Sequence, residues 1–320
     1  MSGERGAGLG RRLAGRDLSA APEALNLLES ESAGDAADRA ALLAEVSPAV
    51  LGAEPAGHVV GITGPPGAGK STLISALCRE LRELGRTVAV VAVDPSSKRS
   101  GGSLLGDRAR IAFDPSDAGL LIRSMAAGER LGGLARPTRD AAAALAAAFD
   151  VVVVETVGVG QSETEVAEIA DTVCVVVQPG SGDTLQFIKS GIMEIPDVLA
   201  VTKADLGTIA QRARRDLHAA LRSLGARGTK VVAVSSVPPP SGIGELIAAV
   251  DAHGESIDLA QSRATRRRVQ ALAEFAEQYG RTGMEALGGR RAAVKSLDSL
   301  DASAGVPGMV AELASRAGVE

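Results

Sequence analysis

From residue 58 to about residue 252, short and almost wholly apolar runs alternate with longer segments of helical periodicity. Residues 151–154 are consecutive valines, and continuous runs of this kind are typical of strands buried on both faces of a parallel sheet. Strands are expected at residues 59–63, 87–93, 120–122, 151–155, 172–178, 198–202 and 230–234. Helices are expected at residues 70–84, 136–148, 209–224 and 244–252. The alternation predicts an α/β fold with a mainly parallel sheet flanked by helices, in which ligands bind beyond the carboxyl ends of the strands.

Helical patterns flank this central region on both sides. Partly amphipathic segments at 19–28 and 37–46 precede it, and three further helices are expected at 261–279, 291–300 and 310–317. The first of these three has an apolar face made of Val269, Leu272, Ala273 and Ala276. The pattern predicts an N-terminal helical extension (1–57), a central domain (58–252) and a C-terminal helical arm (253–320). This arm packs either on the main domain or on another subunit.

Composition narrows the class of protein. Aromatic residues make up 2% of the chain and tryptophan is absent, so aliphatic side chains must fill the core. The net charge is −5 without a long basic run, which argues against nucleic acid as a partner. No segment approaches the ~18 consecutive apolar residues of a membrane span, and the N-terminal arginines lack the apolar stretch of a secretory signal. Cys78 and Cys174 fit neither a metal site nor a disulfide framework, so a reducing, cytoplasmic location is expected.

The segment Gly-Pro-Pro-Gly-Ala-Gly-Lys-Ser at residues 64–71 carries the clearest chemistry. It lies between an expected strand and an expected helix, as a phosphate-binding P-loop requires, although a chance turn is the alternative in a chain with 38 glycines. Glycines let backbone N–H groups turn toward a phosphate, and the start of the helix adds its positive dipole end. Lys70 can reach the terminal phosphates, and the Ser71 hydroxyl can hold Mg²⁺. The residues expected to bind nucleotide here are Gly64, Pro65, Pro66, Gly67, Ala68, Gly69, Lys70, Ser71 and Thr72.

Two carboxylates directly follow or end expected strands. Asp94 can hold Mg²⁺ directly or through water, or it can simply open a turn before Pro95. Glu155 ends the valine run, where P-loop proteins place their Walker B carboxylate, and a solvent-exposed strand end is the alternative. Gly158 can donate its N–H to a γ-phosphate. No residue has the geometry of a strong general base, so catalysis is expected from positioning and charge neutralisation.

A further segment, Thr-Lys-Ala-Asp at residues 202–205, ends another expected strand and has the form of a base-recognition loop. Its aspartate can accept hydrogen bonds from N1–H and the exocyclic amine of guanine, while the lysine stem covers the ring face. Adenine offers no matching donors at that edge, so the pair selects guanine. A backbone N–H after the next strand can meet the guanine carbonyl. The residues expected to bind the base are Thr202, Lys203, Asp205, Ser235, Ser236 and Val237.

Taken together, these segments resemble the MeaB/ArgK-type GTPases, called MMAA in animals. The resemblance covers roughly residues 55–250, and its most specific parts are the glycine-rich segment after Asp94 and the Gly-Ile-Met-Glu segment at 191–194. The matching stretches are residues 61–72, 93–97, 100–107, 131–136, 155–163 and 186–194. The resemblance implies a P-loop NTPase fold with helical extensions at both ends, and homodimers joined through the C-terminal helices.

The resemblance also implies a function. Members of this family look like GTPase chaperones of adenosylcobalamin-dependent acyl-CoA mutases, above all methylmalonyl-CoA mutase. They gate cofactor loading and protect or reactivate the mutase. GTP or GDP and Mg²⁺ are the expected ligands, and this chain is not expected to bind cobalamin itself or to meet a membrane. Hydrolysis is expected to be slow alone and faster with the mutase, while residues 94–110, 155–168 and 178–189 move with nucleotide state.

Particular residues acquire roles by the same resemblance. The phosphates and Mg²⁺ would be surrounded by Lys70, Ser71, Asp94, Asp107 and Glu155. Arg110 and Lys189 would balance charge in the transition state. Thr202 stands where the family usually has asparagine, whose amide braces the loop and the base, so a lower GTP affinity is expected.

Two other functions fit a P-loop. One is a kinase acting on a small molecule or a transport protein, for which the sequence shows neither an acceptor site nor an arginine-rich lid. The other is a metal-insertion GTPase of the nickel-chaperone kind, which usually carries clustered histidine or cysteine. Here His58, His218 and His253 are scattered. Which acyl-CoA mutase would be the client stays open.

Overall fold

A computed structural model of the chain describes residues 3–94, 111–126, 134–156, 166–180, 196–223, 225–226 and 228–319. The chain forms two compact units. One comprises Gly57–Ala142 and Phe149–Ile257, and it contains the sheet. The other comprises Met1–Ala56, Ala143–Ala148 and Asp258–Glu320, and its described elements are helices.

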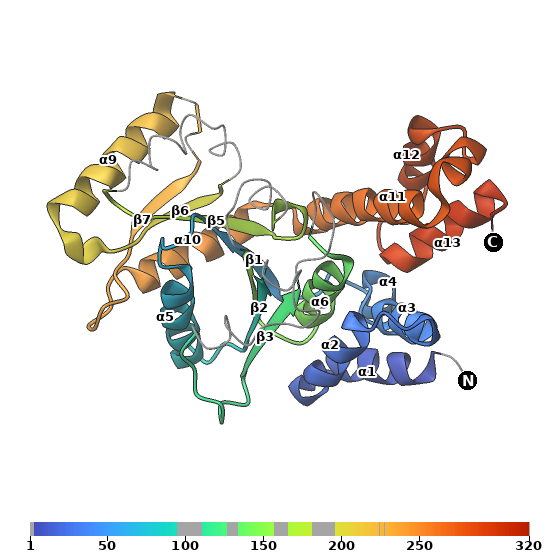
Figure 1. Ribbon diagram of the computed structural model, residues 1–320, viewed down its shortest axis with the longest axis horizontal. Helices are drawn as coiled ribbons and strands as arrows, with labels where there is room; N and C mark the ends of the chain where they lie inside the picture. Colours follow the sequence, from blue (N-terminus) through green and yellow to red (C-terminus); the bar gives the residue numbers. More distant parts are fainter. Residues whose placement is uncertain are drawn as a thin grey trace. The chain divides into compact units, whose positions relative to one another are not determined.

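The described residues of the first unit form a seven-stranded sheet in which all neighbouring strands are parallel, in the order β3-β2-β4-β1-β5-β6-β7 (Figure 1). The strands are β1 (His58–Thr63), β2 (Val88–Asp94), β3 (Leu120–Ala126), β4 (Val151–Thr156), β5 (Thr172–Val177), β6 (Val198–Val201) and β7 (Lys230–Ala233). The predicted α/β fold with its parallel sheet is confirmed. β3 runs past the predicted end at residue 122 to Ala126, because an edge strand tolerates the half-buried Arg123 that interrupts its apolar run.

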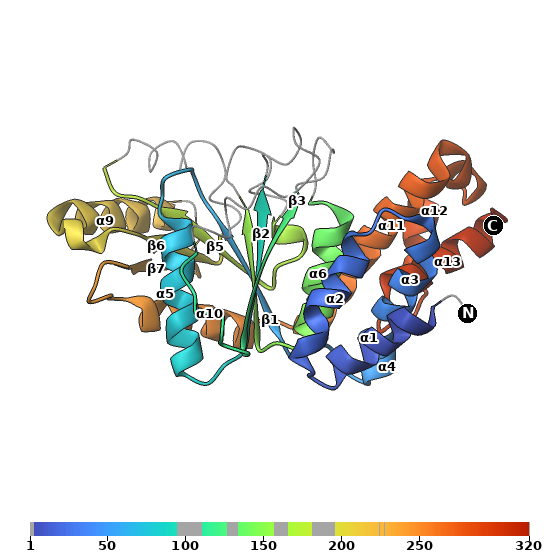
Figure 2. The ribbon, with the colours of Figure 1, turned by 60° about the horizontal axis from the view of Figure 1, so that its bottom comes forward.

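Helices cover both faces of the sheet. On one face, α5 (Lys70–Glu83) and α10 (Ile243–Ser256) pack on alternate strand residues. On the other, η4 (Val166–Glu168) and α9 (Thr208–Ser223) pack on the remaining residues of β5 and β6, while α6 (Arg136–Ala146) precedes β4. In Figure 2 the loop between β1 and α5 lies at the upper end of the strands, and α5 runs back alongside them. The fold therefore brings this loop to the carboxyl edge, where ligands of such sheets bind.

The two cysteines lie inside this core. Cys78 of α5 and Cys174 of β5 are both buried, and neither is in a disulfide. Burial raises the pKa of each thiol to about 12. Since the thiolate is the reactive form, both groups are inert packing residues at neutral pH.

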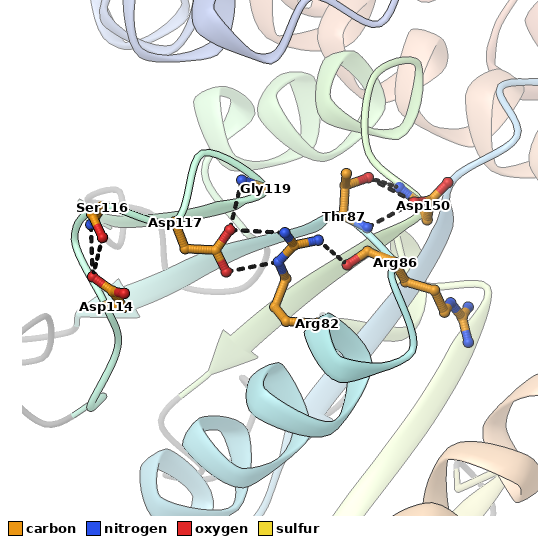
Figure 3. A network of polar contacts seen from close by, with 8 residues as sticks. All are labelled: Arg82, Arg86, Thr87, Asp114, Ser116, Asp117, Gly119 and Asp150. Atoms are coloured by element: carbon orange, nitrogen blue, oxygen red, sulfur yellow. Dashed lines mark hydrogen bonds and ion pairs between the residues drawn. The ribbon is translucent and has the colours of Figure 1, made fainter.

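A polar network ties together the amino ends of three strands (Figure 3). The Arg82 guanidinium at the end of α5 donates to both carboxylate oxygens of Asp117, each at 2.8 Å. Before β2, the N–H and the hydroxyl of Thr87 donate to Asp150 Oδ2 at 2.7 and 2.8 Å. These contacts hold the ends of the strands that lie away from the β1–α5 loop. The Arg82 guanidinium also holds the pKa of the Asp117 carboxyl below its usual range.

We expect Asp117→Asn to lower the free energy of unfolding by about 1–3 kcal/mol at neutral pH, because Arg82 loses an ionised hydrogen-bond partner. The folded-state pKa of Asp117 lies below its unfolded-state value, so the stabilisation is present above the unfolded-state pKa and is lost as the pH falls through the folded-state pKa. Urea unfolding should therefore show a difference between wild type and variant that shrinks in acid. Asp114→Asn is the control, because the Asp114 carboxylate accepts hydrogen bonds from the N–H and hydroxyl of Ser116 within its own turn. An equal effect of both substitutions would contradict the role of the Arg82 pair.

The second unit joins helices from both ends of the chain. Its N-terminal helices are α1 (Glu4–Ala14), α2 (Ala21–Glu29), α3 (Ala36–Glu45) and α4 (Pro48–Leu51), and its C-terminal helices are α11 (Leu259–Ala286), α12 (Arg290–Asp298) and α13 (Val306–Ala317). The Arg267 guanidinium donates to both carboxylate oxygens of Glu54, at 2.9 and 2.7 Å. Arg263 donates to the Pro55 carbonyl at 2.6 Å. These contacts tie the segment before the sheet to the long helix after it.

Two expectations for these flanking helices need correction. Val269 does not lie on the buried face of α11, since its side chain is 58% exposed; Ala271, Leu272 and Phe275 face the core that α11 shares with α12 and α13. Helices α1 and α4 were also not predicted from the sequence. The glycines within α1 interrupt its helical pattern. Within the described ranges, no helix has both the length and the apolar character needed to cross a membrane.

Candidate functional site

The chain between β1 and α5 turns through residues with positive φ. Gly64, Gly67 and Gly69 have φ values of 143°, 78° and 90°. Gly64 is required twice over, because a Cβ there would also overlap the backbone oxygen of Val176 in β5. Gly69 is the N-cap of α5, and the first N–H groups of a helix have no partner within the helix. The loop and the first turn of α5 thus present an anion-binding end of a helix, as the P-loop prediction requires.

Lys70 lies against this loop. Its side chain is 7% exposed, and its Nζ donates to the carbonyls of Gly64 at 2.7 Å and Pro65 at 3.2 Å. The ammonium therefore has a fixed place beside the loop carbonyls, from which it can reach a phosphate held by the loop.

Two predicted Mg²⁺ ligands come together beside the loop. Ser71 Oγ, in the first turn of α5, donates to Glu155 Oε1 at 3.1 Å, and Glu155 in β4 is buried. This corrects the alternative that Glu155 is a solvent-exposed strand end. A hydroxyl and a carboxylate are hard oxygen donors of the type that Mg²⁺ takes in nucleotide sites, so the pair fits this metal.

The rest of the predicted metal and phosphate set is not defined by the structure. Asp94 is the last residue of β2, next to Ala126 in β3, and its backbone alone is described. Asp107, Arg110, Gly158 and Lys189 lie outside the described residues. In the part of the chain that is described, no group of three His, Cys, Asp or Glu side chains is placed to hold a metal ion.

The segment after β6 is joined to the phosphate loop through Thr202. This residue is buried, its N–H donates to Val177 O at 2.9 Å, and its hydroxyl donates to Ala68 O at 2.7 Å. The hydroxyl thus connects the Thr-Lys-Ala-Asp segment with the P-loop. The hydroxyl thus makes a contact to the loop at the position where the resemblance expects an asparagine amide. The expected effect of Thr202 on GTP affinity stays a prediction.

The two base-recognition segments also contact each other. The hydroxyl of the buried Ser235 donates to Asp205 Oδ1 at 2.8 Å, and the Ala204 N–H donates to Val234 O at 3.0 Å. In the loop after β7, the Ser235 N–H pairs with Ser241 O and the Val237 N–H with Ser235 Oγ. Among the described residues, Ser236 N–H makes no such bond, so it is available to a carbonyl oxygen. These contacts place the Asp205 carboxylate beside the segment after β7 that is expected to meet the base carbonyl.

Sequence reasoning missed one contact in this site. Gln178, directly after β5, accepts a hydrogen bond from Lys203 Nζ at 2.6 Å. The only signal in the sequence was its position at the carboxyl end of a strand.

Fold and site together define a P-loop NTPase: the sheet is parallel, and the glycine loop and the base-recognition segment meet at its carboxyl edge. A family model described as "Methylmalonyl Co-A mutase-associated GTPase MeaB" matches residues 21–286. The chain belongs to this family.

Relatives and a solved structure extend this finding. A protein of Mycobacterium bovis named "Probable GTPase" is 41% identical over 273 residues, which cover 83% of this chain and 80% of that protein. A protein of Pyrococcus horikoshii that is named as a GTPase is 55% identical over 149 residues, so the match spans 46% of this chain and about half (47%) of that relative. The mouse protein named "Methylmalonic aciduria type A homolog, mitochondrial" is 42% identical over 55% of this chain and 44% of its own length. The crystal structure titled "LAO/AO transport system kinase" is 27% identical, covers 98% of both chains and has a TM-score of 0.66.

Proposed function

We propose that this protein binds GTP with Mg²⁺, hydrolyses it to GDP and phosphate, and acts as a chaperone of an adenosylcobalamin-dependent acyl-CoA mutase of the methylmalonyl-CoA mutase type. Nucleotide state gates the loading of adenosylcobalamin into the mutase, and the chaperone protects or reactivates that enzyme. The description of the family and the name of the mouse relative support this client. Hydrolysis is slow in the free protein and faster when the mutase is bound.

One observation carries the choice of guanine nucleotide. Thr202 joins the segment that bears Asp205 to the Ala68 carbonyl of the phosphate loop, at 2.7 Å. A nucleotide whose phosphates lie in the loop would therefore reach Asp205 with its base. Ser235 fixes one carboxylate oxygen of Asp205, which directs the acceptors toward the N1–H and amine of guanine.

The chemistry assigned to this chain is positioning and charge neutralisation. Lys70 and the first turn of α5 hold the terminal phosphates. Ser71 and Glu155 hold Mg²⁺, which neutralises charge on the phosphates when bound. Asp94 and Asp107 complete the proposed metal set, and Gly158, Arg110 and Lys189 are the proposed contacts to the transferring phosphate.

We further propose a homodimer formed through the C-terminal helices. Val269 of α11 and Val294 of α12, which are 58% and 41% exposed, are the apolar side chains that such an interface would cover.

A second candidate function is phosphate transfer to a small molecule or a transport protein. It is favoured by the likeness, over 98% of this chain, to the structure titled as a transport system kinase. Transfer of labelled γ-phosphate to any acceptor other than water would support it, and release of all label as inorganic phosphate would exclude it.

Asp205→Asn tests the proposed function. We expect the variant to lose GTP affinity by about 10- to 100-fold, the equivalent of a lost hydrogen-bonded charge, and to gain affinity for xanthosine triphosphate, whose base edge matches an amide. Hydrolysis of both nucleotides is measured with and without methylmalonyl-CoA mutase. Asp216→Asn is the control, because it removes the same charge at a 61% exposed position on α9. An unchanged base preference would contradict guanine recognition by Asp205. A hydrolysis rate that is already fast in the free protein and does not change when the mutase is added would contradict the chaperone assignment.

A further inference from the structure

Lys203 has an unusual backbone conformation. Its φ and ψ are 53° and 42°, in the left-handed region, and among the described residues Arg16 is the one other non-glycine residue with positive φ. Such a conformation costs free energy and persists where the surroundings fix it. Here the next N–H bonds to Val234 O at 3.0 Å, and Leu206 N–H bonds to the Lys203 carbonyl at 3.0 Å. The backbone thus fixes the direction in which the lysine side chain leaves the loop.

The far end of the same side chain is fixed by Gln178. Lys203 Nζ donates to Gln178 Oε1 at 2.6 Å. An ammonium has donors only, so the oxygen of the amide must face it. Pro179 disfavours a helical backbone for Gln178, and Val177, the residue before it, accepts the Thr202 N–H at 2.9 Å. The backbone of Gln178 is therefore held by β5 beside the base-recognition loop, and its side chain spans the remaining distance to Lys203.

We infer that Gln178 is a positioning residue for guanine binding: it holds the Lys203 stem in the orientation that covers the base before the nucleotide arrives. The inference rests on the proposed function, in which Lys203 covers the ring face. Lys203 is exposed, and an exposed lysine without a partner samples many rotamers that binding must then restrict. Restraint in advance lowers that cost and raises affinity. Because Gln178 touches the ammonium and not the phosphates, it affects binding and not the chemical step.

Gln178→Met provides the test, because methionine keeps the size of the side chain and removes the acceptor. We expect the Kd for GDP and the KM for GTP to rise about three- to tenfold, the effect of one hydrogen bond to a charged group, with kcat within about twofold of wild type. Gln178→Glu keeps an acceptor for the ammonium and should restore the Kd to within about twofold. Gln211→Met, at an exposed position on α9, is the matched control and should change neither constant.

A double-mutant cycle with Lys203→Ala separates positioning from general destabilisation. If Gln178 acts through the lysine, Gln178→Met should have no further effect on the Kd in the Lys203→Ala background. Additive effects of the two substitutions, or a Gln178→Met protein with wild-type Kd and KM, would overturn the inference. In both cases a normal base switch in Asp205→Asn would leave the proposed function intact. If Asp205→Asn instead kept the base preference of the wild type, both the proposed function and this inference would be refuted.

Discussion

Lys70→Ala is expected to reduce GTP and GDP binding by about 100-fold or more, since a buried ammonium that bonds to phosphate contributes a charge-assisted hydrogen bond at close range. Lys70 is 7% exposed and its Nζ lies 2.7 Å from the Gly64 carbonyl, so the ammonium is held beside the loop. Alanine leaves the backbone N–H groups of the loop in place. The loss therefore includes the contact of the ammonium with phosphate and its two hydrogen bonds to the loop carbonyls.

Isothermal titration with GDP and with GTP provides the measurement for Lys70→Ala. Arg79→Ala is the control, because it removes one positive charge from an exposed position on the same helix. It should leave both affinities near wild type. Thermal unfolding of the free proteins checks that the variants fold. Unchanged GTP affinity in a folded Lys70→Ala protein would contradict the assignment of the P-loop.

The sheet could be predicted because its strands share one sequence pattern, a short run of consecutive apolar residues. Runs such as residues 151–154 have no polar face, and a strand of this kind is stable only when helices cover both sides. Helix α5 was predicted for a related reason, since its apolar residues recur on the face that meets the sheet. The order of the strands could not be read from the sequence, because it depends on contacts between segments that are far apart.

The candidate site could be predicted as far as it depends on position after a strand. Glu155 and Asp205 were assigned in this way and Lys70 by its place in the P-loop segment, and the structure brings Ser71 and Glu155 together at 3.1 Å. The contacts that Thr202 and Gln178 make could not be predicted. They depend on distances between β5, β6 and the phosphate loop, and neither residue type signals its partner.

Helix α1 shows why propensity alone failed at the N-terminus. Gly6, Gly8 and Gly10 lie within it, and glycine is a poor helix former in isolation. Packing on α3 compensates, because the two helices approach so closely that a Cβ at Gly6 would overlap the backbone oxygen of Asp38. At Gly10 a Cβ would lie 2.6 Å from Glu45 Cβ and 2.7 Å from Leu42 O. The Gly6 N–H also donates to Asp38 Oδ1 at 3.0 Å.

Gly6→Ala and Gly8→Ala should therefore change stability in opposite directions. Gly6→Ala forces α1 away from α3, and we expect it to lower the free energy of unfolding by about 1–3 kcal/mol, even after the better helix propensity of alanine is counted. Gly8 has no atom within 4 Å of an added Cβ. Gly8→Ala should consequently raise the free energy of unfolding by up to about 1 kcal/mol, through propensity alone.

Urea unfolding followed by circular dichroism measures both glycine variants under one set of conditions. The pair is informative because the substitution, the helix and the change in propensity are the same, and the distance to α3 alone differs. If both variants were stabilised, α1 would not need to approach α3 closely, and packing against α3 would not explain why glycine occupies position 6. If both were destabilised, the finding that a Cβ at Gly8 meets no neighbouring atom would be contradicted. Opposite signs would establish that Gly6 belongs to a packing face, which holds α1 against α3 despite the low helix propensity of glycine.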